Sequence, residues 1–146
     1  MKFLLVSATV NEVAPLMELL GFEQRKDENF FACKYNNEDF DLIITGAGIM
    51  HTTYYLAKHL KKEKYSMVIN LGIAGSFTKE IKPGTTVIVD EDVTADLGVE
   101  TETSFLDIHD LKLIDKNKFP YTDGKFVNTT VINTPMLNSL KHAKGI

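Results

Sequence analysis

Short, continuously apolar segments alternate with helical patterns through the first half of the chain, and this alternation limits the possible folds most strongly. Residues 2–7 (KFLLVS) are one such segment, and residues 66–72 (SMVINLG) are another. A strand without polar alternation is buried on both faces, as in sheets that carry helices on both sides. The pattern predicts an α/β fold with a mixed, mostly parallel central sheet flanked by helices.

The helical patterns carry recognisable start and stop signals. Residues 11–22 (NEVAPLMELLGF) predict a helix that Asn11 caps and Gly21 ends. A second helix is expected over residues 50–64, and a third over residues 134–144, where a threonine and a proline supply the start. These helices alternate with the apolar strands, as an α/β fold requires.

Further strands are expected where apolar and aromatic residues lie between turn residues. Two of them surround the polar turn NNED and predict a hairpin, one follows a Pro-Gly turn, and one follows an Asp-Gly turn. In chain order these strands cover residues 29–35, 40–46, 85–93 and 125–133. We therefore expect residues 1–146 to form a single domain.

Composition excludes several classes of protein. The chain has 146 residues, of which 44% are hydrophobic, and its net charge is −4. An acidic balance argues against nucleic-acid binding, because phosphate contacts need a basic face. No run approaches the roughly 18 apolar residues of a membrane helix, so no membrane partner is expected. The single cysteine, Cys33, fits a reducing cytoplasm.

Three suggestive stretches follow predicted strands directly: SATVNEV at residues 7–13, TGAGIMH at residues 45–51 and NLGIAGS at residues 70–76. Ligands of α/β sheets bind beyond the carboxyl ends of the strands. Glycine, alanine and serine leave the backbone amides open to a polar ligand. The coincidence of three such stretches predicts a pocket for a small molecule.

Several familiar chemistries do not match these stretches. The TGAG sequence lacks the third glycine of a dinucleotide fingerprint, and no Gly-Lys-Ser/Thr follows it. Ser76 does not lie in a G-x-S-x-G elbow. The four histidines have no metal-ligand spacing. We therefore expect neither a metal nor a cofactor.

Glu12 is the candidate catalytic acid, and two interpretations of it stay open. It lies in the first turn of the first predicted helix, where the helix dipole favours a carboxylate in any protein. Alternatively, its side chain points into the cleft and activates a water molecule as a general base.

Three blocks of the sequence carry a resemblance to a known family. They are MKFLLVSATVNEV (1–13), LIITGAGIMHT (42–52) and VINLGIAGSFTKEIKPGTTVIVDEDVTADLG (68–98). Together they resemble the nucleoside phosphorylase and nucleosidase superfamily, and within it the futalosine hydrolases most. The resemblance implies that water breaks the N-glycosidic bond of a purine nucleoside. For futalosine, the products would be hypoxanthine and dehypoxanthine futalosine, in menaquinone biosynthesis.

The resemblance also implies roles for individual residues. Glu12 matches the glutamate that holds the attacking water, residues 46–48 lie beside the ribose, and residues 73–76 run along the nucleoside. Residues 128–130 fall near the part of the family that packs on the base. The substrate-binding residues implied in this way are Gly46, Ala47, Gly48, Ile73, Ala74, Gly75, Ser76 and Thr129.

Two departures from the family pattern leave alternatives open. No arginine stands where phosphorolytic relatives hold phosphate, which favours water over phosphate as the nucleophile. The family's later ribose-binding glutamate and base-protonating aspartate find no match before Ile146, so we expect roughly the N-terminal two-thirds of such an enzyme. The alternatives are a catalytically silent chain that binds nucleosides or self-associates, and a phosphorolytic relative. The family also implies a homo-oligomer.

Overall fold

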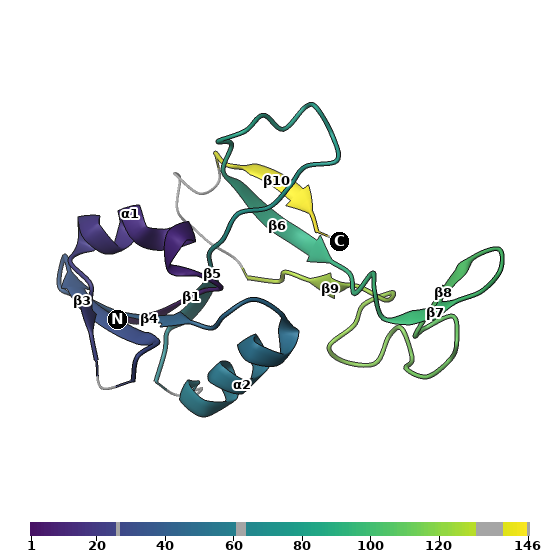
Figure 1. The fold of residues 1–146 in the computed structure, drawn as a ribbon, viewed down its shortest axis with the longest axis horizontal. Helices are drawn as coiled ribbons and strands as arrows, with labels where there is room; N and C mark the ends of the chain where they lie inside the picture. The colour runs from purple at the N-terminus through teal and green to yellow at the C-terminus, as the bar shows by residue number, and fades with distance from the viewer. Residues whose placement is uncertain (26, 61–63, 131–138, 146) are drawn as a thin grey trace. The chain divides into compact units, whose positions relative to one another are not determined.

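The computed structural model describes residues 1–25, 27–60, 64–130 and 139–145. The chain divides into two compact units, Met1–Ser76 and Phe77–Ile146. Each unit has its own sheets and is described by itself (Figure 1).

The first unit is built on a five-stranded mixed sheet with the order β2-β3-β4-β1-β5. Its strands are β1 Lys2–Ser7, β2 Glu23–Gln24, β3 Phe30–Tyr35, β4 Glu38–Ile44 and β5 Met67–Asn70. Strand β1 pairs in parallel with β4 and β5, whereas β3 pairs antiparallel with β4 and β2. The predicted α/β class is confirmed. The sheet is mixed and not mostly parallel, because the short connections on either side of β3 allow only antiparallel pairing.

The predicted hairpin of β3 and β4 is confirmed. Asn36 and Asn37 form its two-residue loop, and both have positive φ values, 49° and 64°. Asparagine tolerates this left-handed conformation better than other residues with a side chain. Two such residues in a row give the turn that matches the twist of an antiparallel pair.

Helices α1 (Val10–Leu20) and α2 (Ile49–His59) cover opposite faces of this sheet (Figure 1). On the α1 face, Leu5 and Leu42 pack with Val13 of the helix. On the α2 face, Leu4, Val6 and Ile43 form a second cluster. Tyr55 and Leu56 of α2 pack against it. Successive residues of β1 therefore enter different cores, which explains why KFLLVS has no polar alternation.

Helix α1 begins earlier than its sequence pattern indicates. The N-cap is Thr9, with extended backbone angles of −136° and 154°, and not Asn11, which lies inside the helix. Glu12, three residues after Thr9, completes a capping box, and this pairing favours the earlier start. Gly21 ends the helix in the left-handed conformation, with a φ of 68°, as predicted.

The second unit contains short strands. They are β6 Val87–Asp92, β7 Gly98–Glu100, β8 Phe105–Asp107, β9 Phe126–Val127 and β10 Lys141–Lys144. Strand β6 lies between β10, which is parallel to it, and β9, which is antiparallel. Strands β7 and β8 form a separate antiparallel pair. The predicted strand over 85–93 is confirmed, and the one over 125–133 is reduced to β9, with residues 131–133 outside the described ranges.

The third helix, predicted over residues 134–144, is wrong in the part that the structure describes. Lys141–Lys144 form strand β10, and residues 134–138 lie outside the described residues. The strand forms because it pairs with β6, with His142 opposite Ile88. Lys144 also binds Glu91 through an ion pair of 2.7 Å. Pairing between distant segments thus overrides the local helical pattern.

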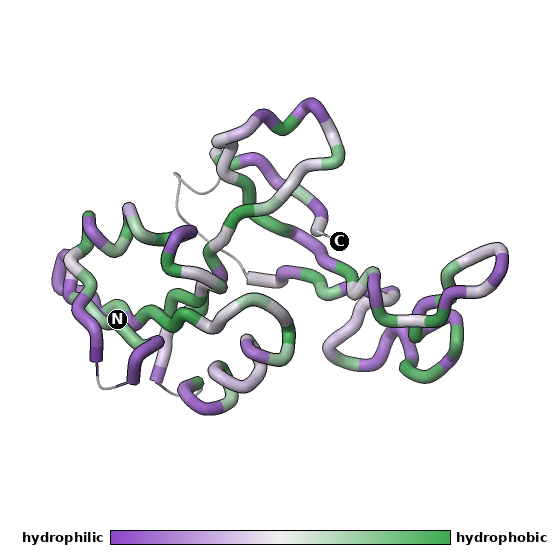
Figure 2. Tube along the Cα trace, viewed as in Figure 1, coloured by the Kyte–Doolittle hydropathy of each residue, from purple (hydrophilic) through white to green (hydrophobic). Residues whose placement is uncertain are grey.

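Burial is concentrated in the first unit. Among the described residues, seven apolar side chains are buried. Six of them belong to the first unit, and the seventh, Ile108, belongs to the second. Figure 2 shows the apolar residues of β1 gathered along one stretch of the tube, whereas β6 changes from apolar to polar along its length. The first unit therefore supplies a packed support for the loops that leave its sheet.

Candidate functional site

The carboxyl ends of β1, β4 and β5 lie side by side. Ser7 is paired with Ile44, and Val6 with Asn70, so the three parallel strands end at one edge of the sheet. Backbone hydrogen bonds also join the segments at that edge. Gly46 N–H donates to the Ala8 carbonyl (3.0 Å), and Leu71 N–H donates to the Val6 carbonyl of β1 (2.8 Å). The predicted convergence of the three strand-end stretches is therefore present in the structure.

The Glu12 carboxylate is the centre of this edge. Its Oε2 atom accepts hydrogen bonds from Thr9 N–H (2.8 Å), Thr9 Oγ1 (2.9 Å) and Ser7 Oγ (3.4 Å). Its Oε1 atom accepts a hydrogen bond of 3.2 Å from Ile73 N–H, in the loop after β5. One side chain thus joins the ends of β1 and β5 through four donors.

These donors lower the pKa of Glu12 below its ordinary value. The hydrogen bond from Ile73 N–H has the largest effect, and the one from the Thr9 hydroxyl follows, while partial burial acts in the opposite direction. Donors that point at a carboxylate stabilise its charged form. Glu12 is therefore an anion at neutral pH and can accept a hydrogen bond from a water molecule or a hydroxyl group.

Glu12 makes hydrogen bonds of two kinds, one within the cap of α1 and one outside it. The contact with Thr9 N–H is the reciprocal half of a capping box, and it satisfies a donor at the start of α1. The contact with Ile73 is not part of helix capping, because Ile73 belongs to another loop. The same carboxylate therefore caps α1 with one oxygen and holds a strand-end loop with the other.

Gly72 fits closely against this carboxylate. A Cβ atom at position 72 would lie 3.0 Å from Glu12 Oε1, tighter than an ordinary van der Waals contact. The glycine lets the loop approach Glu12 closely enough for the next residue, Ile73, to donate its N–H. Part of the small-residue stretch NLGIAGSF is thus explained by the approach of backbone to a carboxylate.

The loop at residues 46–48 leads into α2. Gly46 and Gly48 have φ values of 80° and 97°, a region that residues with a Cβ rarely adopt. Gly48 is the N-cap of α2. The His51 Nδ1 atom lies 3.1 Å from the Ala47 carbonyl oxygen, so this histidine folds back on the loop. The predicted residues Gly46, Ala47 and Gly48 accordingly lie beside the end of β1.

The loop at residues 73–76 is open to solvent. Ile73 is 83% exposed, and Ala74, Gly75 and Ser76 are exposed as well. A Cβ atom at Gly75 would meet no other atom within 4 Å among the described residues. Packing within the described part of the chain therefore explains Gly72 but gives no reason for a small residue at position 75.

Thr129 belongs to the second unit and is exposed. It follows β9, where Asn128 donates its N–H to the Asp90 carbonyl (2.7 Å) and accepts from Thr130 N–H at Oδ1 (3.0 Å). The first of these contacts holds the segment against β6, and the second lies within the segment. The strand-end edge described above is built from the first unit alone.

Ser7 and Thr9 position the Glu12 carboxylate, and neither was a predicted site residue. The Ser7 side chain is completely buried, and its hydroxyl also donates to the Thr9 carbonyl at 3.2 Å. The signal for Thr9 was present, since a threonine three residues before a glutamate is the capping-box spacing. Within the described ranges, no three metal-ligating side chains come together, and no helix has the length and apolar character to cross a bilayer.

No protein-family model matches the chain. A futalosine hydrolase from Streptomyces coelicolor is 33% identical over 79 residues, which is 51% of this chain and 34% of that protein. A Helicobacter pylori futalosine hydrolase structure has a TM-score of 0.59 at 22% identity and matches 73% of this chain and 52% of that one. An H. pylori 5′-methylthioadenosine/S-adenosylhomocysteine nucleosidase has a TM-score of 0.62 at 20% identity, over 99% of this chain and 62% of that one.

The chain thus has the fold of solved nucleosidase structures. The predicted resemblance to futalosine hydrolase is confirmed as a similarity in sequence. The chain spans about a third of the length of that curated relative and about half of the length of the solved futalosine hydrolase.

Proposed function

We propose that this chain carries the water-activating site of a purine nucleosidase, with Glu12 as the catalytic residue. The observation that supports it best is the Glu12 carboxylate, ionised at neutral pH and held by Ile73 N–H and Thr9 at the carboxyl ends of three parallel strands. Ligands of α/β sheets bind at such an edge. An oriented anion there can hold a water molecule for attack on a sugar carbon.

In the proposed reaction, the C1′–N bond between ribose and purine breaks while a bond from water to C1′ forms. Positive charge develops on the sugar in the transition state, and the negative charge of Glu12 stabilises it. Glu12 takes the proton that the attacking water loses. The departing purine takes up a proton from solvent water, and Glu12 afterwards returns its proton to the solvent.

The two glycine-containing loops are the proposed walls for the nucleoside. We assign Gly46, Ala47 and Gly48 to the ribose side, because Gly46 N–H binds the end of β1 and the loop stays close to the edge. The stretch from Ile73 to Ser76 is assigned to the length of the nucleoside, since it is exposed and begins at the Glu12 contact. Thr129 is proposed as the contact to the base.

Futalosine is the proposed substrate, with hypoxanthine and dehypoxanthine futalosine as products. The 33% identity to the S. coelicolor futalosine hydrolase supports this choice. We place the reaction in menaquinone biosynthesis in the cytoplasm, in a homo-oligomer. We also propose that both units belong to one nucleosidase-like domain, since one nucleosidase structure matches 99% of the chain.

The proposal is tested by incubating the purified chain with futalosine, 5′-methylthioadenosine and inosine, each with and without phosphate. Free base is followed by chromatography. Release of hypoxanthine from futalosine at a rate independent of phosphate is expected. A rate that requires phosphate, with ribose 1-phosphate formed from inosine, would indicate a phosphorylase instead.

A second candidate function is nucleoside binding without hydrolysis. It is favoured by the three donors that already surround Glu12 Oε2, one from Ser7 at the end of β1 and two from Thr9, the N-cap of α1. A carboxylate engaged in this way could serve the fold alone. Calorimetry that detects futalosine binding, together with no release of base, would support this candidate over the first.

A further inference from the structure

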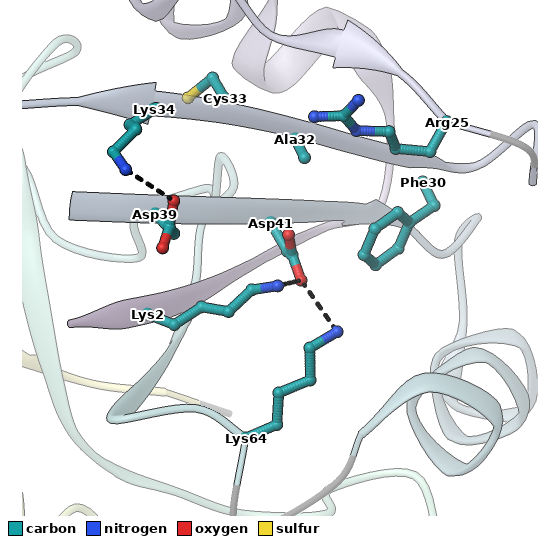
Figure 3. A pocket seen from close by; sticks show the side chains of 9 residues that line it. All are labelled: Lys2, Arg25, Phe30, Ala32, Cys33, Lys34, Asp39, Asp41 and Lys64. Atoms are coloured by element: carbon teal, nitrogen blue, oxygen red, sulfur yellow. Dashed lines mark ion pairs between the residues drawn. The ribbon is translucent and has the colours of Figure 1, made fainter. Parts of the chain in front are cut away.

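A hollow of about 530 Å³ lies on the α2 face of the first unit, away from the strand-end edge. Four cationic and two carboxylate side chains line it, which gives a formal local charge of +2 from +4 and −2. The chain as a whole has a net charge of −4. The charged lining residues are Lys2, Arg25, Lys34, Lys64, Asp39 and Asp41 (Figure 3).

Asp41 fixes two of these cations. Its side chain is only 4% exposed, and its Oδ2 atom is 2.8 Å from Lys2 Nζ and 3.6 Å from Lys64 Nζ. The Tyr65 hydroxyl donates to the same oxygen at 2.7 Å. An ammonium group has three donors, and only one is directed at Asp41. Lys2 and Lys64 therefore keep donors for a ligand and are held in place by a buried charge (Figure 3).

Arg25 is the arginine among the cations that line the hollow. Within the described ranges, no carboxylate lies within ion-pair distance of its guanidinium group. Its backbone is nevertheless fixed, because Arg25 N–H donates to the Phe30 carbonyl at 2.8 Å. Figure 3 shows the guanidinium lying over β3, on the opposite side of the hollow from Lys64. Its planar fork of donors matches the oxygens of a phosphate group.

We propose that this hollow binds a small molecule that carries a phosphate group, with Arg25 as the bidentate donor to the phosphate and with Lys2 and Lys64, on the opposite side of the hollow, as positioned cations that attract the anion. Neutralising Asp41 would need only one of the two lysines, so the lining carries more positive charge than the fold requires. The volume lies within the range of small-molecule pockets, roughly 300–1,000 Å³, and exceeds what a phosphate alone would fill. Phe30 lines the hollow beside Arg25 and offers an apolar surface to the rest of the ligand.

This site is separate from the proposed catalytic edge. Its lining comes from one face of β1, β3 and β4 and from the segments beside them, whereas Glu12 lies where the parallel strands end. Phosphate bound here would not be the nucleophile of a phosphorolytic reaction. The inference consequently does not depend on the proposed hydrolysis.

The test is calorimetric titration of the full chain with inorganic phosphate and pyrophosphate at low ionic strength. Saturable binding is expected, and Arg25→Gln should weaken it about tenfold or more, because it removes the bidentate pair of charge-assisted hydrogen bonds. Arg25→Lys, which keeps the charge but not the fork, should weaken it less. The matched control is Lys118→Gln, which removes one positive charge in the second unit and should leave binding unchanged.

Three outcomes would overturn the proposal. One is the absence of saturable binding of either anion by the unmodified chain. Another is an equal loss of affinity in the Arg25→Gln and Lys118→Gln variants, which would mean attraction by overall charge only. Citrate binding as tightly as pyrophosphate would also contradict the assignment to phosphate. Base release from futalosine should be the same for Arg25→Gln and the unmodified chain, which separates this site from the catalytic proposal.

Discussion

Glu12 Oε1 accepts a hydrogen bond of 3.2 Å from Ile73 N–H, although 61 residues separate the two along the chain. The contact joins the first turn of α1 to the loop that follows β5. It also has the largest effect in lowering the pKa of Glu12. The geometry of the candidate site thus depends on how closely one glycine-containing loop approaches one carboxylate.

Gly72→Ala should disturb this contact. The added Cβ atom would lie 3.0 Å from Glu12 Oε1, so the carboxylate or the loop must shift by a few tenths of an ångström. A longer hydrogen bond from Ile73 raises the pKa of Glu12 toward its ordinary value. An NMR titration of the Glu12 carboxyl carbon measures the shift. Gly75→Ala is the control, because its Cβ atom meets open space and should leave the titration unchanged.

Thr9→Ala should destabilise the chain by about 1 kcal/mol, the usual cost of losing an N-cap side chain. The substitution also removes the Thr9 hydroxyl from Glu12 Oε2, where it donates at 2.9 Å. Urea unfolding measures the stability, and the carboxyl titration should show a higher Glu12 pKa. Thr9→Ser keeps the hydroxyl and should behave like the unmodified chain. A Thr9→Ala protein of unchanged stability would argue against the capping role.

The stability contribution of Glu12 should depend on pH with a defined sign. The pKa of Glu12 in the folded chain lies below its ordinary value of 4.5. The ionised carboxylate therefore stabilises the fold above that ordinary value, and the contribution is lost as the pH falls through the folded-state pKa. Unfolding free energies of the unmodified chain and Glu12→Gln should differ most near neutral pH and converge in acid. A constant difference down to low pH would contradict the lowered pKa.

Tyr65→Phe should destabilise the first unit by about 1.5–3 kcal/mol, the range for a hydrogen bond to a charged group. The Tyr65 hydroxyl donates to the buried Asp41 carboxylate at 2.7 Å, and burial together with this bond raises the pKa of Tyr65. Phenylalanine keeps the ring that lies near Lys2 and Lys64, so only the hydroxyl is removed. Chemical unfolding measures the loss. Tyr35→Phe, at an exposed position, should cost little.

Local patterns predicted the first unit well. Residues 2–7 match β1 residue for residue, because a strand with a core on each face must be apolar throughout. The turn at Asn36 and Asn37 follows from residues that tolerate positive φ. The convergence of three loops at one edge follows from the parallel pairing of the strands before them.

Local sequence patterns could not predict the contacts between segments that are far apart in the chain. The hydrogen bond from Ile73 to Glu12 depends on how closely two strand-end loops approach each other, which no local pattern encodes. The segment Lys141–Lys144 has a helical pattern, yet it pairs with β6. Asn11 is of a residue type that favours the N-cap position. Thr9 is nevertheless the N-cap of α1, because Glu12 lies three residues after it and completes the capping box.

A comparison of three forms of the chain tests the proposal that Glu12 activates the water that cleaves the nucleoside. Hypoxanthine release from futalosine and futalosine binding are measured side by side for the unmodified chain, Glu12→Gln and Glu18→Gln, the last being an exposed acid of the same helix. We expect Glu12→Gln to lower the rate by about a hundredfold or more while nucleoside binding persists, and Glu18→Gln to change neither. An undiminished rate in Glu12→Gln would mean that Glu12 is not the catalytic base.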